Sequence, residues 1–354
     1  MNENNYNVIG VMSGTSLDGV DLAHLNFSFD ECWKFKILKA ETIPYSVDWI
    51  NQLKKLTSVS TEKLKELDIS YTRYLSQTVN TFIQNNKINS LDAICSHGHT
   101  ALHQPLNRMT YQIGNLPEIA YLTQQIVVCD FRTQDVALGG QGAPLVPIGD
   151  RFLFSEFDFC LNLGGFANIS MDKDGNRIAY DICPVNIVLN HFVSDLGFDY
   201  DDKGKIASQG ELNHDLLTEL NSLRFYQDSY PKSLGLEWVK SEIFPLINTY
   251  NLNIKDILRT FTEHIAIQIS KHLNAKKNAI VLVSGGGAYN DFLIKRIQSQ
   301  TNTSIIIPDK TIIEFKEALI FGFLGVLRLR NEVNCLRSVT GASKDHSSGK
   351  IYSP

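Results

Sequence analysis

The sequence contains no long apolar run, no cysteine pair of the metal-binding kind and no excess of basic residues. Its longest apolar stretch, ALIFGFLGVL at 318–327, is about half as long as a membrane-spanning helix needs to be, so we expect no membrane segment. With a net charge of −5, the chain lacks the basic face that nucleic-acid binding usually requires. The polar start, MNENNYN, has no basic leader or apolar region, so we expect no signal peptide and a cytoplasmic protein.

The six cysteines are scattered, and no two of them form the C-x-x-C pair that is typical of zinc sites and redox motifs. They are Cys32, Cys95, Cys129, Cys160, Cys183 and Cys335. In a reducing cytoplasm we expect them to be free, buried thiols rather than disulfides.

The chain shows no low-complexity tract and no short repeat; instead, strand-like and helix-like segments alternate along its 354 residues. This length suggests about two domains. Apolar residues spaced by three and four predict helices over 61–86, with Ser60 as N-cap, and over 254–273. Further helices are expected over 187–196 and 314–329.

Glycine turns separate several of the predicted strands. These strands cover residues 8–12, 21–26, 35–41, 93–96, 126–129, 279–283 and 304–307, with two more inside FDFCLNLGGFANIS at 157–170. Two units of strand, glycine turn and strand, each followed by helices, predict a duplicated α/β protein with a cleft between its halves, where ligands commonly bind.

The first glycine turn, GTSLDGVD at 14–21, has the composition of a phosphate-binding loop. Gly14 and Gly19 would let backbone N–H groups approach a phosphate closely, and Thr15 and Ser16 could donate their hydroxyls to it. The turn lacks the G-x-x-x-x-G-K-[ST] pattern, so it is not a Walker A loop.

Two carboxylates in this turn, Asp18 and Asp21, would repel a phosphate unless a cation lay between them. We therefore expect Mg²⁺ here, held by Asp18 through water. The alternative is that the glycines only form tight hairpins and contact no ligand.

Two further glycine turns follow strands, NLGGFAN at 162–168 and SGGGAYN at 284–290. The former could face the first turn, and the three glycines of the latter leave room for a flat group such as adenine. The residues of these turns that we expect to contact ATP are Asn162, Gly164, Gly165, Gly285, Gly286 and Gly287.

This order of loops resembles the superfamily of sugar kinases, actin and heat-shock chaperones, and the chain is most similar to the family of anhydro-N-acetylmuramic acid kinases. The resemblance extends over nearly the whole chain. The matching segments are GTSLDGVD (14–21), SHGHT (96–100), HQP (103–105), QIGN (112–115), DFR (130–132), GGQGAPLVP (139–147), NLGGFANIS (162–170), Asp181 with Pro184 and Asn186, SGGGAYN (284–290) and KEALIFGFLG (316–325).

The resemblance implies a two-domain, actin-like (ribonuclease H-like) duplicated α/β fold with an interdomain cleft. We expect an N-terminal domain of residues 1–131 plus 331–354 and a C-terminal domain of residues 132–330. It also implies a cytoplasmic, homodimeric phosphotransferase of cell-wall recycling. Such an enzyme uses ATP and Mg²⁺ to open 1,6-anhydro-N-acetylmuramic acid with water and to phosphorylate O6, giving N-acetylmuramic acid 6-phosphate.

Asp181 is the catalytic base that the resemblance implies, because ring opening needs a carboxylate near the attacking water. The alternative is an N-cap of the helix over 187–196, for which Asn186 is better placed. The family usually shows Asp-Thr-Gly-Pro-Gly-Asn here. In this chain Cys183 and Val185 replace the glycines, and a positive φ at either position would be strained.

Arg132 could grip the lactyl carboxylate of a muramic acid in a two-pronged pair. The alternative is an internal ion pair with Asp130 or Asp135. Glu317 lies among apolar residues of the last helix, and the resemblance implies that it orients the substrate.

Three nearby histidines, His97, His99 and His103, raise the possibility of a zinc site, since strand alternation would place the first two on one face. A metal-dependent hydrolase built on them is one rival hypothesis. We prefer His97 as a substrate hydrogen-bond partner. A nucleotide-switched, actin-like binding protein and another sugar kinase of the superfamily remain as further alternatives.

Overall fold

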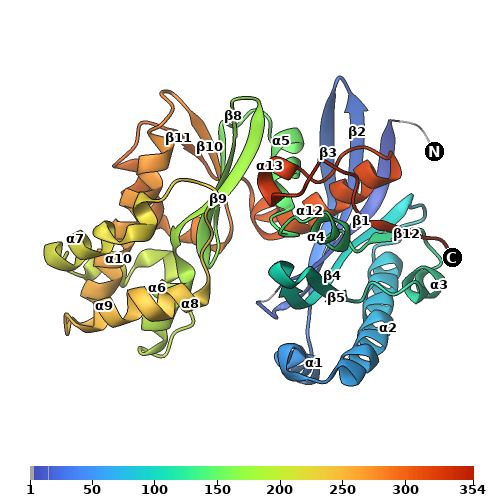
Figure 1. The fold of residues 1–354 in the computed structure, drawn as a ribbon, viewed down its shortest axis with the longest axis horizontal. Coiled ribbons are helices and arrows are strands. Elements are labelled where there is room, and N and C mark those ends of the chain that lie inside the picture. Colours follow the sequence, from blue (N-terminus) through green and yellow to red (C-terminus); the bar gives the residue numbers. More distant parts are fainter. Residues whose placement is uncertain (1–3, 15) are drawn as a thin grey trace. The chain divides into compact units, whose positions relative to one another are not determined.

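The computed structural model describes residues 4–14 and 16–354, and the chain forms two compact units (Figure 1). Unit 1 comprises Met1–Leu153 together with Phe315–Pro354, and unit 2 comprises Phe154–Glu314. We expected the boundaries between the units at 131/132 and 330/331, and the observed boundaries lie elsewhere. The chain leaves unit 1 later and returns to it earlier because Gly149 of α5 packs against Ile320 of α12 within unit 1.

A seven-stranded mixed sheet forms the centre of unit 1, in the order β12-β6-β4-β1-β2-β3, with β5 paired to β4. Strands β1, β4 and β6 run parallel, whereas β1, β2 and β3 form an antiparallel meander. The strands are β1 (Asn5–Ser13), β2 (Gly19–Asp30), β3 (Cys32–Pro44), β4 (Ala93–Gln104), β5 (Met109–Ile113), β6 (Val127–Cys129) and β12 (Lys350–Tyr352).

Unit 2 contains a five-stranded mixed sheet in the order β11-β10-β7-β8-β9. Strands β7, β10 and β11 run parallel, and β7, β8 and β9 form an antiparallel meander. The strands are β7 (Phe159–Leu163), β8 (Phe166–Lys173), β9 (Asn176–Pro184), β10 (Ile280–Ser284) and β11 (Ser304–Ile306).

The two sheets repeat one topology, which confirms the predicted duplicated α/β architecture. In each unit a three-stranded meander is followed by a long helix and then by a strand parallel to the first strand of the meander. A second parallel strand completes the repeat, so β6-β4-β1-β2-β3 corresponds to β11-β10-β7-β8-β9. The carboxyl ends of β1 and β4, and those of β7 and β10, therefore meet at equivalent edges of the two sheets.

The longest predicted helices are confirmed. Helix α10 covers Ile254–Leu273 as expected, and α2 covers Thr61–Asn85, with Ser60 Oγ accepting the backbone N–H of Lys63 at its start. Helix α12 (Lys310–Leu329) begins one turn earlier than predicted. The other helices are α1 (Val47–Leu53), α3 (Glu118–Thr123), α4 (Thr133–Ala137), α5 (Val146–Leu153), α6 (Asn186–Ser194), α7 (His214–Ser222), α8 (Leu236–Trp238), α9 (Phe244–Asn248), α11 (Asp291–Gln298) and α13 (Arg337–Thr340).

Helices cover both faces of the sheet in unit 1. Ile9 and Val11 of β1 belong to the same apolar cluster as Tyr71 of α2. Successive side chains of a strand point to opposite faces, and Gly10, which lies between these two residues, faces the backbone of Ala318 in α12. Polar residues of β4 can therefore be buried under α2 on one face and under α12 on the other.

We expected no membrane-spanning helix and no disulfide bond. Among the described residues, no helix combines the length and the apolar character needed to cross a bilayer. All six cysteines are free. Five are buried, as expected, whereas Cys32 is exposed.

We predict that Gly10→Ala destabilises the protein, because a Cβ at this position would lie 1.9 Å from the carbonyl oxygen of Ala318. Backbone cannot move aside cheaply, so we expect a loss of about 2 kcal/mol or more in the free energy of unfolding, measured by urea titration. The control is Gly165→Ala, whose Cβ would meet no atom closer than 3.8 Å and should cost less than about 0.5 kcal/mol. Equal stability of the two variants would contradict the close packing of β1 on α12.

Candidate functional site

The first glycine turn follows β1 at the edge of the sheet where β1 and β4 end. Ser16 and Asp18 are exposed, and a Cβ at Gly14 would meet nothing closer than 3.6 Å. Thr15 lies outside the described residues. The backbone at Gly14 is therefore open to a ligand, and the exposed side chains offer a hydroxyl and a carboxylate beside it.

Two other residues of this turn take part in strand pairing. A Cβ at Gly19 would lie 2.3 Å from the carbonyl oxygen of Ile43, so β3 can approach only a glycine here. Asp21 Oδ1 accepts a hydrogen bond of 2.6 Å from Thr42 Oγ1. The close approach of β3 is therefore enough to explain why residue 19 is a glycine, without a ligand. Desolvation by the surrounding protein raises the pKa of Glu317, and the nearby carboxylate of Asp21 adds to that rise.

His97 and His99 have different surroundings, so the expectation that they share one face of β4 is wrong. Gly98, between them, has φ +73°, which interrupts the regular alternation. The ring of His97 packs on Phe321 of α12, with centroids 4.6 Å apart, whereas that of His99 lies 6.1 Å from Tyr71 of α2. The two imidazoles therefore lie under different helices.

The proposed histidine zinc site is also not supported. His99 Nδ1 is hydrogen-bonded to Ser13 Oγ at 2.7 Å, and His103 Nδ1 to Thr110 Oγ1 at 3.0 Å. Within residues 4–14 and 16–354, His97, His99 and His103 form no group that could hold a metal ion. A hydrolase built on these side chains therefore has no structural basis.

His97 instead holds Arg132. Its Nδ1 contacts the carbonyl oxygen of Gly98 at 2.9 Å and must carry the proton, because a carbonyl can only accept. Its Nε2 therefore accepts the Nε–H of Arg132, at 2.8 Å. Burial, followed by the charge of Arg132, holds the pKa of His97 well below its usual value, which keeps the ring neutral and able to accept.

The guanidinium of Arg132 makes a second hydrogen bond, from Nη1 to the carbonyl oxygen of Gly142 at 2.6 Å, and it also lies over the ring of Phe321. The alternative of an ion pair with Asp130 or Asp135 is wrong, since neither forms a salt bridge with Arg132 in the described part of the chain. Nη2 has no hydrogen-bond partner among the described residues. Burial lowers the pKa of Arg132 to about 10, so the group remains cationic at neutral pH with one terminal nitrogen available.

Glu317 of α12 lies near this guanidinium without pairing with it. Glu317 is solvent-exposed by its accessible surface, yet the protein around its carboxyl raises its pKa, and the charge of Arg132 opposes that rise. No salt bridge joins the two within the described residues, whereas the neighbouring Lys316 is paired with Asp150 at 2.7 Å. An anionic or polar ligand group could therefore contact Arg132 and Glu317 together.

The other two glycine turns lie side by side in unit 2, at the ends of the parallel strands β7 and β10, where Asn162 is paired with Ser284. A Cβ at Gly285 would lie 2.6 Å from Asn162 Oδ1, and one at Gly287 would lie 2.7 Å from a side chain. At Gly286, in contrast, nothing comes closer than 3.9 Å. Gly285 and Gly287 thus allow the turns to pack together, and Gly286 presents open backbone.

The turn after β7 likewise contains one glycine that is needed for close packing and one glycine with open backbone. A Cβ at Gly164 would lie 3.2 Å from Asn162 Nδ2, whereas one at Gly165 would have only an ordinary contact of 3.8 Å. The carbonyl oxygen of Gly165 accepts the backbone N–H of Val185 at 2.8 Å. The turn is therefore attached to the segment that leads from β9 into α6.

Asp181 lies on β9, and its Oδ2 accepts the backbone N–H of Leu234 at 2.8 Å. Burial raises its pKa, while the hydrogen bond from Leu234 opposes the rise. No salt bridge to Asp181 and no hydrogen bond to its Oδ1 occur among the described residues. The N-cap alternative is wrong, because α6 begins at Asn186 with Val185 in the cap position.

The positive φ that would strain a side chain where the family has glycines does not occur at Cys183 or Val185. Val185 has φ −128°, and Cys183, in β9, is not among the described residues with positive φ. Both side chains are fully buried in the apolar core of unit 2. The substitutions therefore fill the core without forcing the backbone into the left-handed region.

The role of Asp135 and its contacts with the C-terminal segment were not predicted from the sequence. This fully buried carboxylate accepts the backbone N–H of Gly142 at 2.7 Å, and thus fixes the loop whose carbonyl holds Arg132. It also accepts the hydroxyl of Thr340 at 2.7 Å. The only local signal is an acidic residue shortly before the glycines of GGQGAP.

Comparisons with known proteins agree with the resemblance. The family model for anhydro-N-acetylmuramic acid kinase matches residues 6–354. A protein of that name from Sulfurovum sp. (strain NBC37-1) is 34% identical over 99% of this chain and 100% of its own. Another, from Haemophilus influenzae, is 32% identical over 97% of this chain and 97% of its own.

Solved structures of similar fold include component A of the Acidaminococcus fermentans (R)-2-hydroxyglutaryl-CoA dehydratase. It has a TM-score of 0.47 and 10% identity, and the match covers 89% of this chain and 95% of that one. A xylulose kinase from Lactobacillus acidophilus has a TM-score of 0.44 and 11% identity, with 98% and 94% covered. Both TM-scores are below 0.5, and the fold assignment rests instead on the repeated sheet topology.

We predict that His99 makes the protein less stable as the pH falls from 7 to 5. Burial lowers its pKa in the folded protein to about 4, from an ordinary value of 6.5. Between these values the unfolded chain binds a proton that the folded chain does not, so the free energy of unfolding falls by about 2 kcal/mol from this residue alone. His99→Gln should make the pH dependence shallower by that amount in urea titrations at pH 7 and 5.

The control for this experiment is His214→Gln, because His214 is exposed at the start of α7. This variant should keep the pH dependence of the parent. An identical slope in His99→Gln and the parent would show that His99 titrates normally and is not buried against Ser13.

Proposed function

Since the chain belongs to the family of anhydro-N-acetylmuramic acid kinases, we propose that it opens 1,6-anhydro-N-acetylmuramic acid with water and phosphorylates O6 at the expense of ATP. The product is N-acetylmuramic acid 6-phosphate, and the reaction belongs to cell-wall recycling. We further propose a cytoplasmic homodimer. The observation that carries the proposal is the family match over residues 6–354, combined with a desolvated, unpaired carboxylate at Asp181.

ATP would be held by the open backbone of the three glycine turns. Gly14, Gly165 and Gly286 leave space that a Cβ would occupy, and such backbone suits phosphate oxygens or a flat base. The exposed carboxylate of Asp18 suits Mg²⁺, directly or through water. Mg²⁺, when bound, neutralises charge on the transferred phosphoryl group.

Asp181 is the proposed general base. Its Oδ2 is fixed by Leu234, which leaves Oδ1 to take a proton from the water that attacks the anomeric carbon. The bond from that carbon to O6 breaks, and O6 attacks the γ-phosphorus of ATP. A raised pKa makes this carboxylate a stronger base than an exposed aspartate.

Arg132 and Glu317 are the proposed ligands of the sugar. The available Nη2 of Arg132 would donate to the lactyl carboxylate, and the carboxyl of Glu317 would orient a hydroxyl or the amide of the sugar. Both nitrogens of His97 are already occupied by Arg132 and Gly98. We therefore propose that His97 acts through Arg132 as a positioning residue, rather than contacting substrate itself.

The test is incubation with ATP, Mg²⁺ and 1,6-anhydro-N-acetylmuramic acid, followed by mass spectrometry of the sugar. We expect a product heavier by one water and one phosphoryl group, and one ADP for each product. Phosphorylation without gain of water would reject the ring-opening step. ATP binding with no sugar-dependent ADP would favour a nucleotide-switched binding protein instead.

In the same assay, Asp181→Asn removes the base but can keep the acceptor for the N–H of Leu234. Turnover should fall by about 10²-fold or more, since positioned proton transfer contributes that much. Nucleotide affinity, measured by calorimetry, should stay within about threefold of the parent. Asn168 is paired with Asp181 on the neighbouring strand β8, so Asn168→Asp is the control that changes the charge beside Asp181 without removing its carboxylate. Turnover of Asp181→Asn within a few-fold of the parent would reject this base.

A further inference from the structure

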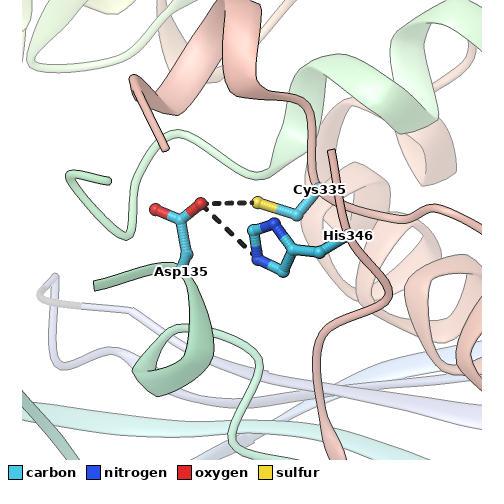
Figure 2. Close-up of side chains that lie close together, drawn as sticks. All are labelled: Asp135, Cys335 and His346. Atoms are coloured by element: carbon cyan, nitrogen blue, oxygen red, sulfur yellow. Dashed lines mark hydrogen bonds and ion pairs between the residues drawn. The ribbon is translucent and has the colours of Figure 1, made fainter. Parts of the chain in front are cut away.

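Three metal-ligating side chains meet in unit 1 away from the glycine turns: Asp135 of α4, Cys335 and His346 (Figure 2). The last two belong to the C-terminal segment, 200 or more residues along the chain. All three are buried, with exposed fractions of 0%, 2% and 5%. A carboxylate, a thiol and an imidazole packed together without solvent are costly unless their charges and protons are balanced.

The three groups converge on one oxygen. Cys335 Sγ lies 3.0 Å from Asp135 Oδ1, and His346 Nε2 lies 3.6 Å from the same atom. Among the described residues, this is the one group of three or more such side chains whose ligand atoms all lie within 4.8 Å of one another.

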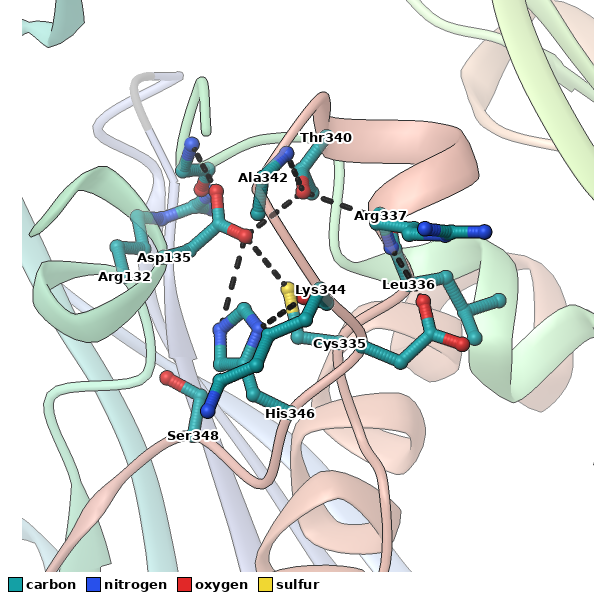
Figure 3. Close-up of polar contacts among 12 residues, drawn as sticks. Arg132, Asp135, Cys335, Leu336, Arg337, Thr340, Ala342, Lys344, His346 and Ser348 are labelled. Carbon is teal, nitrogen blue, oxygen red and sulfur yellow. Dashed lines mark hydrogen bonds and ion pairs between the residues drawn. The ribbon is translucent and has the colours of Figure 1, made fainter. Parts of the chain in front are cut away.

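The protonation of His346 leaves the arrangement incomplete. Its Nδ1 contacts the carbonyl oxygen of Lys344 at 3.1 Å, so Nδ1 carries the proton (Figure 3). In the neutral ring, Nε2 is then a lone pair, and this buried atom has no hydrogen-bond partner. The lone pair faces the carboxylate of Asp135, which is repulsive unless a proton or a metal cation lies between Nε2 and Oδ1. A backbone carbonyl on the second ring nitrogen is also the usual support of a metal-bound histidine.

Nearby charges do not complete the site. Asp135 accepts hydrogen bonds from the hydroxyl of Thr340, the backbone of Gly142 and the thiol of Cys335, and all three donors are neutral. Arg132 is close enough for its pKa to be affected by the cluster, but it donates to His97 and Gly142 rather than to Asp135. A dication would displace the thiol proton of Cys335 to solvent, balance the resulting thiolate and the carboxylate of Asp135, and accept the lone pair of the imidazole nitrogen.

We propose that Asp135, Cys335 and His346 bind a structural Zn²⁺ ion. Sulfur, imidazole nitrogen and carboxylate oxygen together are typical zinc ligands, and a fourth position would be filled by water. Tetrahedral zinc places such ligand atoms about 3.5 Å apart. The distance from Sγ to Oδ1 therefore has to widen by about half an ångström, whereas that from Nε2 to Oδ1 already fits.

This zinc site would fasten the C-terminal segment to α4 and to the loop at Gly142. Because the carbonyl of Gly142 accepts Nη1 of Arg132, the metal would also stiffen the support of that guanidinium. The proposal does not depend on the proposed kinase activity, since none of its three ligands is assigned to nucleotide or sugar.

The test is metal analysis of the purified full-length protein after incubation with excess Zn²⁺ and desalting. We expect about one zinc per chain in the parent, and less than about a tenth of that in Cys335→Ser and in His346→Gln. The matched control is Cys32→Ser, which removes the exposed thiol and should keep the full zinc content. Less than about a tenth of an equivalent in the parent, or undiminished zinc in both variants, would overturn the proposal.

A second measurement needs no variant and therefore does not depend on how well the variants fold. X-ray absorption at the zinc edge of the loaded parent should show one sulfur ligand, with nitrogen or oxygen in the other positions. Removal of zinc by a chelator should lower the melting temperature by several degrees, and added Zn²⁺ should restore it. A zinc ion without a sulfur ligand, or an unchanged melting temperature, would contradict a structural site at Cys335.

Discussion

The hydrogen bond from the Nε–H of Arg132 to the neutral Nε2 of His97 sets the geometry of the candidate site in unit 1. A partly buried guanidinium is costly to desolvate, and no carboxylate pairs with this one in the described part of the chain. Hydrogen bonds to His97 and to the carbonyl of Gly142 hold the group instead, and neither neutralises it. The result is a fixed cation with an unused donor, which is what recognition of a carboxylate requires. Two neighbours support the guanidinium. The ring of Phe321 in α12 packs against it, and Asp135 fixes the loop of Gly142.

Much of the fold could be predicted from the sequence because its signals are local. The apolar stripes of α2 and α10 have helical spacing over 25 and 20 residues, which no strand would show. Glycines after apolar runs marked the turns that follow β1, β7 and β10. The repeated order of strands, turns and helices was therefore visible before the structure, and the duplicated sheet topology confirms it.

The details of the site were less predictable because they depend on backbone geometry and on distant residues. Strand alternation failed at His97 and His99, since a positive φ at Gly98 breaks the period of two. Asp135 also contacts Cys335 and Thr340, which lie 200 or more positions away, and nothing in its own neighbourhood points to them. The predicted boundaries of the two units differ from the observed ones for a similar reason. Helix α12 packs on β1, although the two elements lie near opposite ends of the sequence.

The proposal that Arg132 recognises the lactyl carboxylate is tested most directly by comparing two ligands in Arg132→Lys. A lysine keeps the charge, but its three donors sit on one nitrogen and cannot reach the separate positions that the planar guanidinium fork spans. The account predicts that KM for 1,6-anhydro-N-acetylmuramic acid rises by about tenfold or more, since a charge-assisted bond is lost. The inhibition constant of the same anhydro sugar without its lactyl group should stay within about threefold. Equal weakening of both ligands would contradict the claim, because Arg132 would then support the site without reading the carboxylate.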